Sequence, residues 1–286
     1  MSDSVPSGIR VGGSALPDGV MMLTPLAAAI AREGADGALS VESFELPARE
    51  QHPLEKLPFI RILPKLIGQM SLVVRGWKPQ QSRRPSLPLL VAVVAIGVIS
   101  SLINGLCAGL PSTWHAAGSS LLQLALFFGI VGLTRAVPRF GRIWRFHGGE
   151  HQAIAAYEAG LDLTVENASS RTLYHPRCGT NLATLALLIM VPGMVLGSVI
   201  SGFTGYLITV AIPLPALCVA FELMMWGQKR WKGILLPGLA FQRLTVALPG
   251  PAESRAGLAA LTAALAEHAR VEASRSLTQA GAHAAQ

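Results

Sequence analysis

The chain is organised around the stretch Arg145-Phe-His-Gly-Gly-Glu-His-Gln-Ala-Ile-Ala-Ala-Tyr-Glu158. Within it, His147, Glu150 and His151 are spaced at i, i+3 and i+4, which places their side chains on one face of a helix. The pattern H-x-x-E-H is that of inverted zinc proteases, in which two imidazoles bind a metal and the glutamate polarises a water molecule. This spacing predicts a metal site on a helix.

A second polar cluster, Tyr174-His-Pro-Arg-Cys-Gly-Thr180, is expected to complete that site. Zinc usually takes four ligands, and a catalytic zinc leaves one of these positions to water. We favour His175 as the third protein ligand, followed by Cys178 and then by Glu166. Glu158 is a further candidate, although it lies two helical turns beyond His151 on the same face.

The same residues predict a division of chemical roles. Glu150 would act as the general base on a water whose pKa a bound metal lowers toward 7. Arg177 could neutralise a developing oxyanion or bind a phosphate group. Gly148 and Gly149 each weaken a helix by roughly 1 kcal/mol relative to alanine. For these glycines two explanations stay open: another group approaches the backbone closely, or the motif begins in a loop.

Long uncharged stretches predict the fold class. The chain has 286 residues, of which 51% are hydrophobic and 14% are charged. No Lys, Arg, Asp or Glu occurs from Pro85 to Thr134 or from Asn181 to Phe221. A membrane-spanning helix needs about 20 apolar residues, so each stretch can hold two helices and a turn. We therefore expect a mainly α membrane protein with about four transmembrane helices in two hairpins.

The positive charges predict how these hairpins are oriented. The formal net charge of +7 comes from cations beside the apolar runs, which favours membrane topology over nucleic-acid binding. Cations flank both outer ends of each hairpin and neither turn, so we place both termini and residues 135–180 in the cytoplasm. Pro213 and Pro215 should kink the fourth span. Glu222, near its inner end, is either functional or paired with a nearby Arg or Lys.

The remaining segments predict smaller modules around the membrane core. A β-containing N-terminal module should include a hairpin with Asp36-Gly37 at its turn, and amphipathic helices should lie on the membrane and at the C-terminus, before a disordered tail. The expected divisions are a cytoplasmic module at 1–57, an interfacial helix and basic linker at 58–86, hairpins at 87–134 and 181–226, the site segment at 135–180, and the C-terminal part at 227–286.

At these residues the sequence resembles the YqhQ-like family, bacterial membrane proteins of unknown function described as predicted metal-dependent enzymes. The resemblance runs from Gly12 to about Thr262, and it departs from the family pattern at Asp18 and Gln152, where glutamate and often lysine are found. Its firmest parts are His147-Gly-Gly-Glu-His151, Ala156-Tyr-Glu-Ala-Gly160, Leu163-Thr-Val-Glu-Asn167 and His175-Pro-Arg-Cys-Gly-Thr180. The resemblance supports the fold and the site, and it implies no substrate.

Two functional hypotheses follow. The first is a multi-pass protein of the cytoplasmic membrane that acts as a metal-dependent hydrolase, with zinc as the metal and a peptide, lipid or phosphate ester as substrate. The second is a non-catalytic membrane scaffold or assembly factor, in which the His/Cys cluster ties a cytoplasmic loop together with or without a structural metal. In both, the lipid bilayer is the expected partner and nucleic acid is not.

Overall fold

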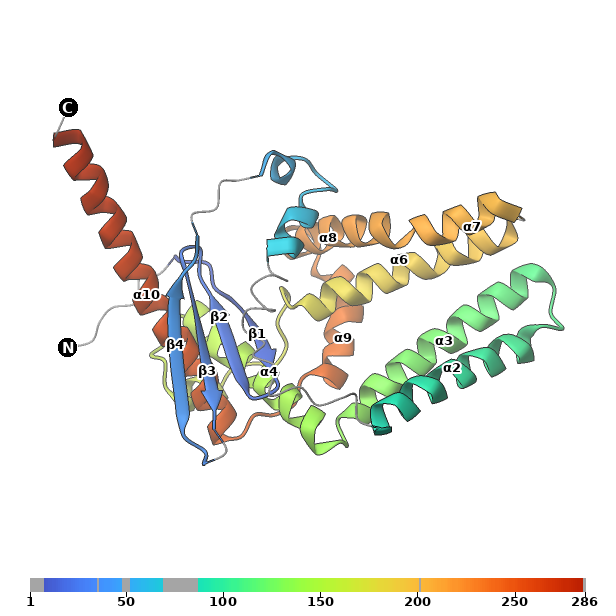
Figure 1. Cartoon of the computed structure of the whole chain (residues 1–286), viewed down its shortest axis with the longest axis horizontal. Coiled ribbons are helices and arrows are strands. Elements are labelled where there is room, and N and C mark those ends of the chain that lie inside the picture. Colours follow the sequence, from blue (N-terminus) through green and yellow to red (C-terminus); the bar gives the residue numbers. More distant parts are fainter. Residues whose placement is uncertain (1–7, 35, 48–51, 69–86, 201, 285–286) are drawn as a thin grey trace. The chain divides into compact units, whose positions relative to one another are not determined.

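The N-terminal module is a four-stranded antiparallel sheet in a computed structural model that describes residues 8–34, 36–47, 52–68, 87–200 and 202–284. Short apolar runs separated by turn-forming residues favour such strands. The strands β1 (Gly12–Leu16), β2 (Gly19–Leu23), β3 (Ala27–Glu33) and β4 (Leu39–Glu45) neighbour one another in chain order (Figure 1). Gly37 has a φ of +78° in the turn between β3 and β4, so the predicted hairpin is confirmed.

The chain divides into two compact units. The first comprises residues 1–51, 134–175 and 245–286, and the second comprises residues 52–133 and 176–244. The first unit contains the sheet and the helices α4 (Pro138–Glu158), α5 (Val165–Ser169) and α10 (Pro251–Ala284). The membrane-related divisions predicted from the sequence stay predictions.

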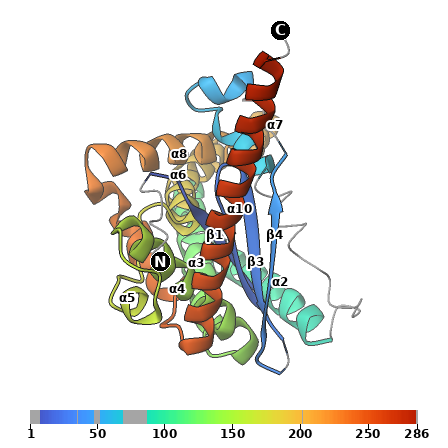
Figure 2. The same cartoon turned by 90° about the vertical axis from the view of Figure 1, so that its left-hand side faces the viewer.

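In the first unit, α4 and α10 cover the same face of the sheet. Val20 and Met22 from β2 are fully buried against Phe146 of α4 and Leu261 of α10. Figure 2 shows α10 running along this face. This shared apolar core gives α4 a rigid setting, because interiors are packed as densely as organic crystals.

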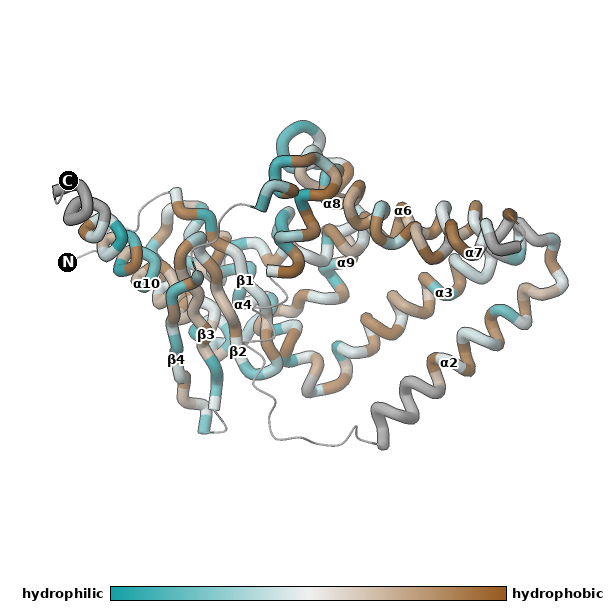
Figure 3. The backbone as a smooth tube through the Cα atoms, turned by 45° about the horizontal axis from the view of Figure 1, so that its top comes forward, coloured by the Kyte–Doolittle hydropathy of each residue, from teal (hydrophilic) through white to brown (hydrophobic). Residues whose placement is uncertain are grey.

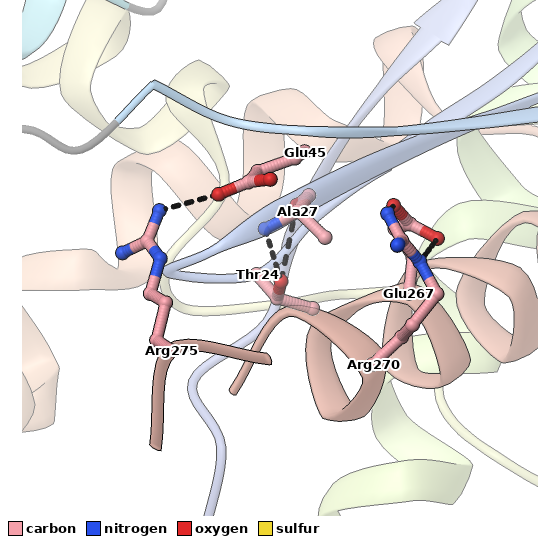
Figure 4. A network of polar contacts seen from close by, with 6 residues as sticks. All are labelled: Thr24, Ala27, Glu45, Glu267, Arg270 and Arg275. Carbon is pink, nitrogen blue, oxygen red and sulfur yellow. Dashed lines mark hydrogen bonds and ion pairs between the residues drawn. The ribbon is translucent and has the colours of Figure 1, made fainter. Parts of the chain in front are cut away.

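Polar contacts also join α10 to the sheet (Figure 4). His268, which is buried, places Nδ1 3.0 Å from the hydroxyl of Thr24. Arg275 forms an ion pair of 2.8 Å with Glu45 of β4. The helix continues to Ala284, into the segment for which the sequence predicts a disordered tail, and that tail stays a prediction.

The second unit is helical. Its elements are η1 (Pro53–Lys56), a helical segment at 62–68, α2 (Leu87–Cys107), α3 (Ser112–Thr134), α6 (Gly179–Val199), α7 (Gly202–Ala211), α8 (Pro213–Lys229), η2 (Lys232–Leu235) and α9 (Leu236–Thr245). Leu182, Phe221 and Leu235 belong to its core. The C-terminal half of the predicted 58–78 interfacial helix lies outside the described residues.

Two helices of the described residues are long and apolar enough to cross a membrane. They contain the windows Ala117–Thr134 and Gly179–Gly197, whose hydrophobic character is visible along α3 and α6 in Figure 3. The described apolar part of α2, Ala95–Cys107, is shorter. In the predicted fourth span, α7 and α8 meet at Ile212, which keeps helical dihedral angles, and Pro213 supplies no N–H to the helix there. The four-span topology is therefore not confirmed.

Glu222 of α8 is held by cations and main chain within the second unit. Its carboxylate accepts hydrogen bonds from Arg61 Nε at 2.7 Å and Nη2 at 2.5 Å, and from the N–H of Phe59 at 3.1 Å. Of the two explanations offered by the sequence, the ion pair is the one observed.

Candidate metal centre

A single continuous helix carries the H-x-x-E-H motif. Pro138 is at the first helical position of α4, where its missing N–H is harmless, and Gly160 follows the C-terminus with a φ of +66°. Because α4 begins nine residues before His147, the explanation that the motif starts in a loop is wrong. The helical spacing of His147, Glu150 and His151 is confirmed.

The two motif glycines lie where other backbone segments approach α4. A β-carbon at Gly148 would be 2.1 Å from the carbonyl oxygen of Ala247, and one at Gly149 would be 2.5 Å from that of Glu253. At Gly257 of α10 it would be 2.6 Å from the oxygen of Gly149. The predicted close approach is therefore confirmed, and it explains two helix-weakening residues in the middle of a helix.

The two motif histidines are oriented by backbone carbonyls. His147 Nδ1 lies 2.8 Å from Thr245 O, and His151 Nδ1 lies 2.5 Å from Leu173 O. A carbonyl only accepts hydrogen bonds, so each Nδ1 donates, and each neutral ring then keeps a lone pair at Nε2. The ring centroids are 4.4 Å apart. Metal-binding histidines commonly donate their second ring nitrogen in this way, which fixes the ring orientation.

His151 is a neutral side chain under ordinary conditions. Burial, together with the neighbouring His147, lowers the pKa of His151 to about 3. Burial likewise lowers the pKa of His175. Neutral imidazole is the form that can bind a metal.

His175 lies close to the motif but is engaged by another predicted ligand. Its Nε2 is 3.2 Å from a carboxylate oxygen of Glu158, and its ring centroid is 5.8 Å from that of His151. Because a carboxylate accepts, His175 donates from Nε2 and keeps its lone pair at Nδ1. Glu158 therefore contacts one candidate ligand directly.

Cys178 is the N-cap of α6, where its sulfur accepts a hydrogen bond from the N–H of Thr180 at 3.4 Å. His147, His151 and Cys178 each offer one ligand atom, and these atoms all lie within 4.8 Å of one another. This group could hold a metal ion. Burial raises the pKa of the Cys178 thiol, so a metal would have to displace its proton.

The other predicted site residues are placed differently. Glu150 is buried, with 6% of its surface exposed, and lies against Gly13 of β1. Arg177 is exposed, and Glu166 is exposed in the first turn of α5.

Sequence reasoning missed the groups that hold the motif in place. The carbonyls of Thr245 and Leu173 could not be found, because every residue carries one. Gln152, which is 2% exposed, donates to the carbonyls of Ser169 at 3.5 Å and Arg171 at 3.3 Å and so fastens the loop before His175. Gln152 could have been noticed in the sequence, because it is a polar residue in the apolar half of the helix that carries the motif.

Comparison with known proteins identifies the family. A family model described as a protein of unknown function (DUF1385) matches residues 81–267, which include α4 and the whole His/Cys region. The chain belongs to the DUF1385 family. A relative described as uncharacterized protein YqhQ, from Bacillus subtilis (strain 168), is 25% identical over 212 residues. That match covers 62% of this chain and 66% of the relative, just under two thirds of its length. No solved structure matches.

Proposed function

We propose that this DUF1385 protein is a membrane-associated, metal-dependent hydrolase whose site is formed around α4. The observation that carries the proposal is the pair of hydrogen bonds from His147 Nδ1 to Thr245 O and from His151 Nδ1 to Leu173 O. With both Nδ1 atoms on carbonyls, Nε2 is the nitrogen that each ring can offer to a metal, on one helix face and oriented before any metal binds. Hydrogen bonding alone would not require both rings to present the same nitrogen.

Residues of two types would hold the metal. His147 and His151 supply nitrogen donors, and Cys178 is favoured as the third ligand by the spacing of the three ligand atoms. His175 remains the alternative third ligand. Mixed nitrogen and sulfur donors suit zinc, so zinc is the proposed metal. When bound, such an ion supplies a Lewis acid that lowers the pKa of water and polarises a substrate oxygen.

The chain's own residues would then handle the proton. Glu150 adjoins His151 in α4, is buried, and has no second role in metal binding under this assignment. We assign it to remove a proton from the attacking water and to return that proton to the leaving group. The hydrogen bond between Glu158 and His175 would keep the His175 ring in one orientation. Arg177 is the proposed partner for negative charge on the substrate.

Membrane attachment is supported by the two long apolar helices. The windows Ala117–Thr134 and Gly179–Gly197 contain no charged residue. Arginines at 135, 139, 142 and 145 follow the first window at once, which favours the cytoplasmic side for the segment that contains α4. We therefore propose an integral protein of the cytoplasmic membrane with its site and both termini at the cytoplasmic face.

The alternative is a scaffold in which the cluster is structural. It is favoured by the burial of the motif, since His151 is only 2% exposed and Glu150 only 6%. A substrate would need a path to these groups, whereas a structural metal or hydrogen-bonded cluster would not.

The substitution Glu150→Gln separates the two functions. It keeps the size of the side chain but removes the base, so a hydrolase variant should retain its metal and fail to complement a deletion strain. Glu42→Gln, on the exposed face of β4, is the matched control and should complement fully. Full complementation by Glu150→Gln with metal retained would favour the scaffold.

A further inference from the structure

Among the residues that the structure describes, the first strand of the sheet has a free edge. In the order β1-β2-β3-β4, β1 pairs there on one side only. The other edge strand, β4, carries the exposed charges of Glu42 and Glu45, which discourage pairing with a further strand. The β1 sequence, Gly12-Gly-Ser-Ala-Leu16, contains no charge. Its edge therefore lacks the charged side chains that discourage strand addition.

The hairpins determine which β1 residues face that edge. Thr24 N donates to Ala27 O at 2.9 Å across the turn between β2 and β3. Bonded and non-bonded pairs alternate along an antiparallel ladder, so Met22 and Val20 turn their main-chain groups toward β3. The other residues of β2 bond to β1.

Two residues of β1 then direct their main chain outward. Every residue of β1 has a partner in β2, and the alternation makes Gly12, Ser14 and Leu16 the hydrogen-bonded ones. Gly13 and Ala15 consequently point their N–H and C=O groups away from β2. Within the described part of the chain no hydrogen bond is found for these groups. The outward main-chain groups of Gly13 and Ala15 are about 7 Å apart. A second extended chain also presents its main-chain groups about every 7 Å on one side, so the two can pair.

The outward groups lie beside the proposed general base. Gly13 pairs with Met22, which faces the core shared with α4, and cross-strand partners lie on the same face. A β-carbon at Gly13 would accordingly be 2.8 Å from Cγ and from Oε1 of Glu150. A backbone added to β1 would run about 5 Å from it, adjacent to this carboxylate.

We infer that the substrate is an extended polypeptide segment that adds to the free edge of β1 as a fifth strand. This inference rests on the proposed hydrolase function and selects one of its substrate classes. The main-chain groups of Gly13 and Ala15 would give affinity without demanding particular side chains. Lipids and phosphate esters lack donors and acceptors at this repeat.

The reaction needs water as its only co-substrate. The water oxygen bonds to the peptide carbonyl carbon while Glu150 takes one of the water protons. The C–N bond then breaks, and Glu150 gives that proton to the departing amine. The products are a carboxylate and an amine.

The first experiment uses the detergent-solubilised full chain, loaded with zinc, and a peptide library prepared from a whole proteome. Mass spectrometry identifies the peptides that are cleaved by wild type and left intact by Glu150→Gln. The inference predicts such peptides. Glu150-dependent hydrolysis of phospholipid vesicles or p-nitrophenyl phosphate without any peptide cleavage would overturn it while leaving the hydrolase proposal standing. Absence of all hydrolysis would contradict both.

The second experiment tests the strand geometry without changing the protein. One cleaved peptide is resynthesised with a single N-methyl group at each position in turn. Methylation should reduce cleavage by about tenfold at every second residue, where the N–H donates to β1, and have little effect between them. Equal effects at all positions would contradict strand addition.

A binding measurement gives a readout that does not depend on activity. Amide hydrogen exchange is followed in the Glu150→Gln protein with and without the same peptide. Exchange in the segment 11–16 should slow when the peptide binds, because the amides of Gly13 and Ala15 become hydrogen-bonded. Slowing at β4 instead, or slowing without peptide at rising protein concentration, would indicate another surface or self-association and would overturn the inference.

Discussion

Gly13 of β1 lies directly against the side chain of Glu150, so closely that a β-carbon at position 13 would be 2.8 Å from its Cγ and Oε1. A β-carbon at the neighbouring residue, Gly12, would have no other atom within 4 Å. This contrast makes the pair a matched test of how the sheet positions the acid.

Gly13→Ala should displace Glu150, whereas Gly12→Ala should not. Overpacking of this kind costs about 1–3 kcal/mol of unfolding free energy, which thermal unfolding would detect. Shortening the acid in the double variant Gly13→Ala/Glu150→Asp should recover part of the loss, as a double-mutant cycle measures. Equal stabilities of the two alanine variants would show that the side chain simply moves aside.

The close approach of α4 and α10 gives a second prediction. Gly149→Ala should destabilise the protein although alanine is the better helix former, because its β-carbon would be 2.5 Å from Glu253 O. Gly129 of α3, with nothing within 4 Å, is the matched helical control, and its alanine variant should be neutral or more stable. A stabilised Gly149→Ala protein would refute the packing of this helix pair.

The ion pair of Arg145 and Glu253 predicts a pH dependence. Burial alone would raise the pKa of Glu253, but the hydrogen bond from Arg145 Nε at 2.9 Å and further hydrogen bonds outweigh it, so the pKa lies below its ordinary value. A carboxyl group whose pKa is lower in the folded protein than in the unfolded protein stabilises the fold at any pH above its pKa in the unfolded protein. This contribution is lost as the pH falls through its pKa in the folded protein.

Wild type should therefore be more stable than Glu253→Gln at neutral pH, and the difference should shrink below about pH 4 as the carboxyl is protonated. Unfolding curves of both proteins across this range measure it. A difference that is constant with pH would mean that the charge of Glu253 contributes nothing.

Gln152 should control the loop that carries Leu173 and His175. Gln152→Leu removes the donor to the carbonyls of Ser169 and Arg171, so amide exchange at 170–175 should accelerate. Metal affinity should fall by about 10–100-fold, as for other groups that support ligands. Gln152→Lys keeps a donor and should stay close to wild type. Identical exchange in all three proteins would exclude this role.

The sequence predicted best what depends on local periodicity. The helical spacing of His147, Glu150 and His151 and the hairpin at Gly37 follow from short-range geometry, and both are observed. For Gly148 and Gly149 the sequence predicted that another group could approach the helix closely. It could not predict which segment of the chain approaches them.

Long-range pairings were beyond the sequence. The third ligand stayed open because His175 and Cys178 lie at the end of a loop, whose path depends on contacts such as that of Gln152 with Arg171. The free edge of β1 could not be predicted either, because strand order follows from packing between distant elements. The kink predicted at Pro213 falls where α7 and α8 meet, and the four-span topology stays a prediction.

The central claim is that the imidazoles of His147 and His151 bind a metal ion, and elemental analysis of the purified, detergent-solubilised chain tests it most directly. Wild type should contain about one zinc ion per chain, and His52→Ala, which changes an exposed histidine far along the sequence, should match it. His147→Ala should contain almost none while remaining folded. A metal-free wild type, or a His147→Ala protein with full metal content, would contradict the account.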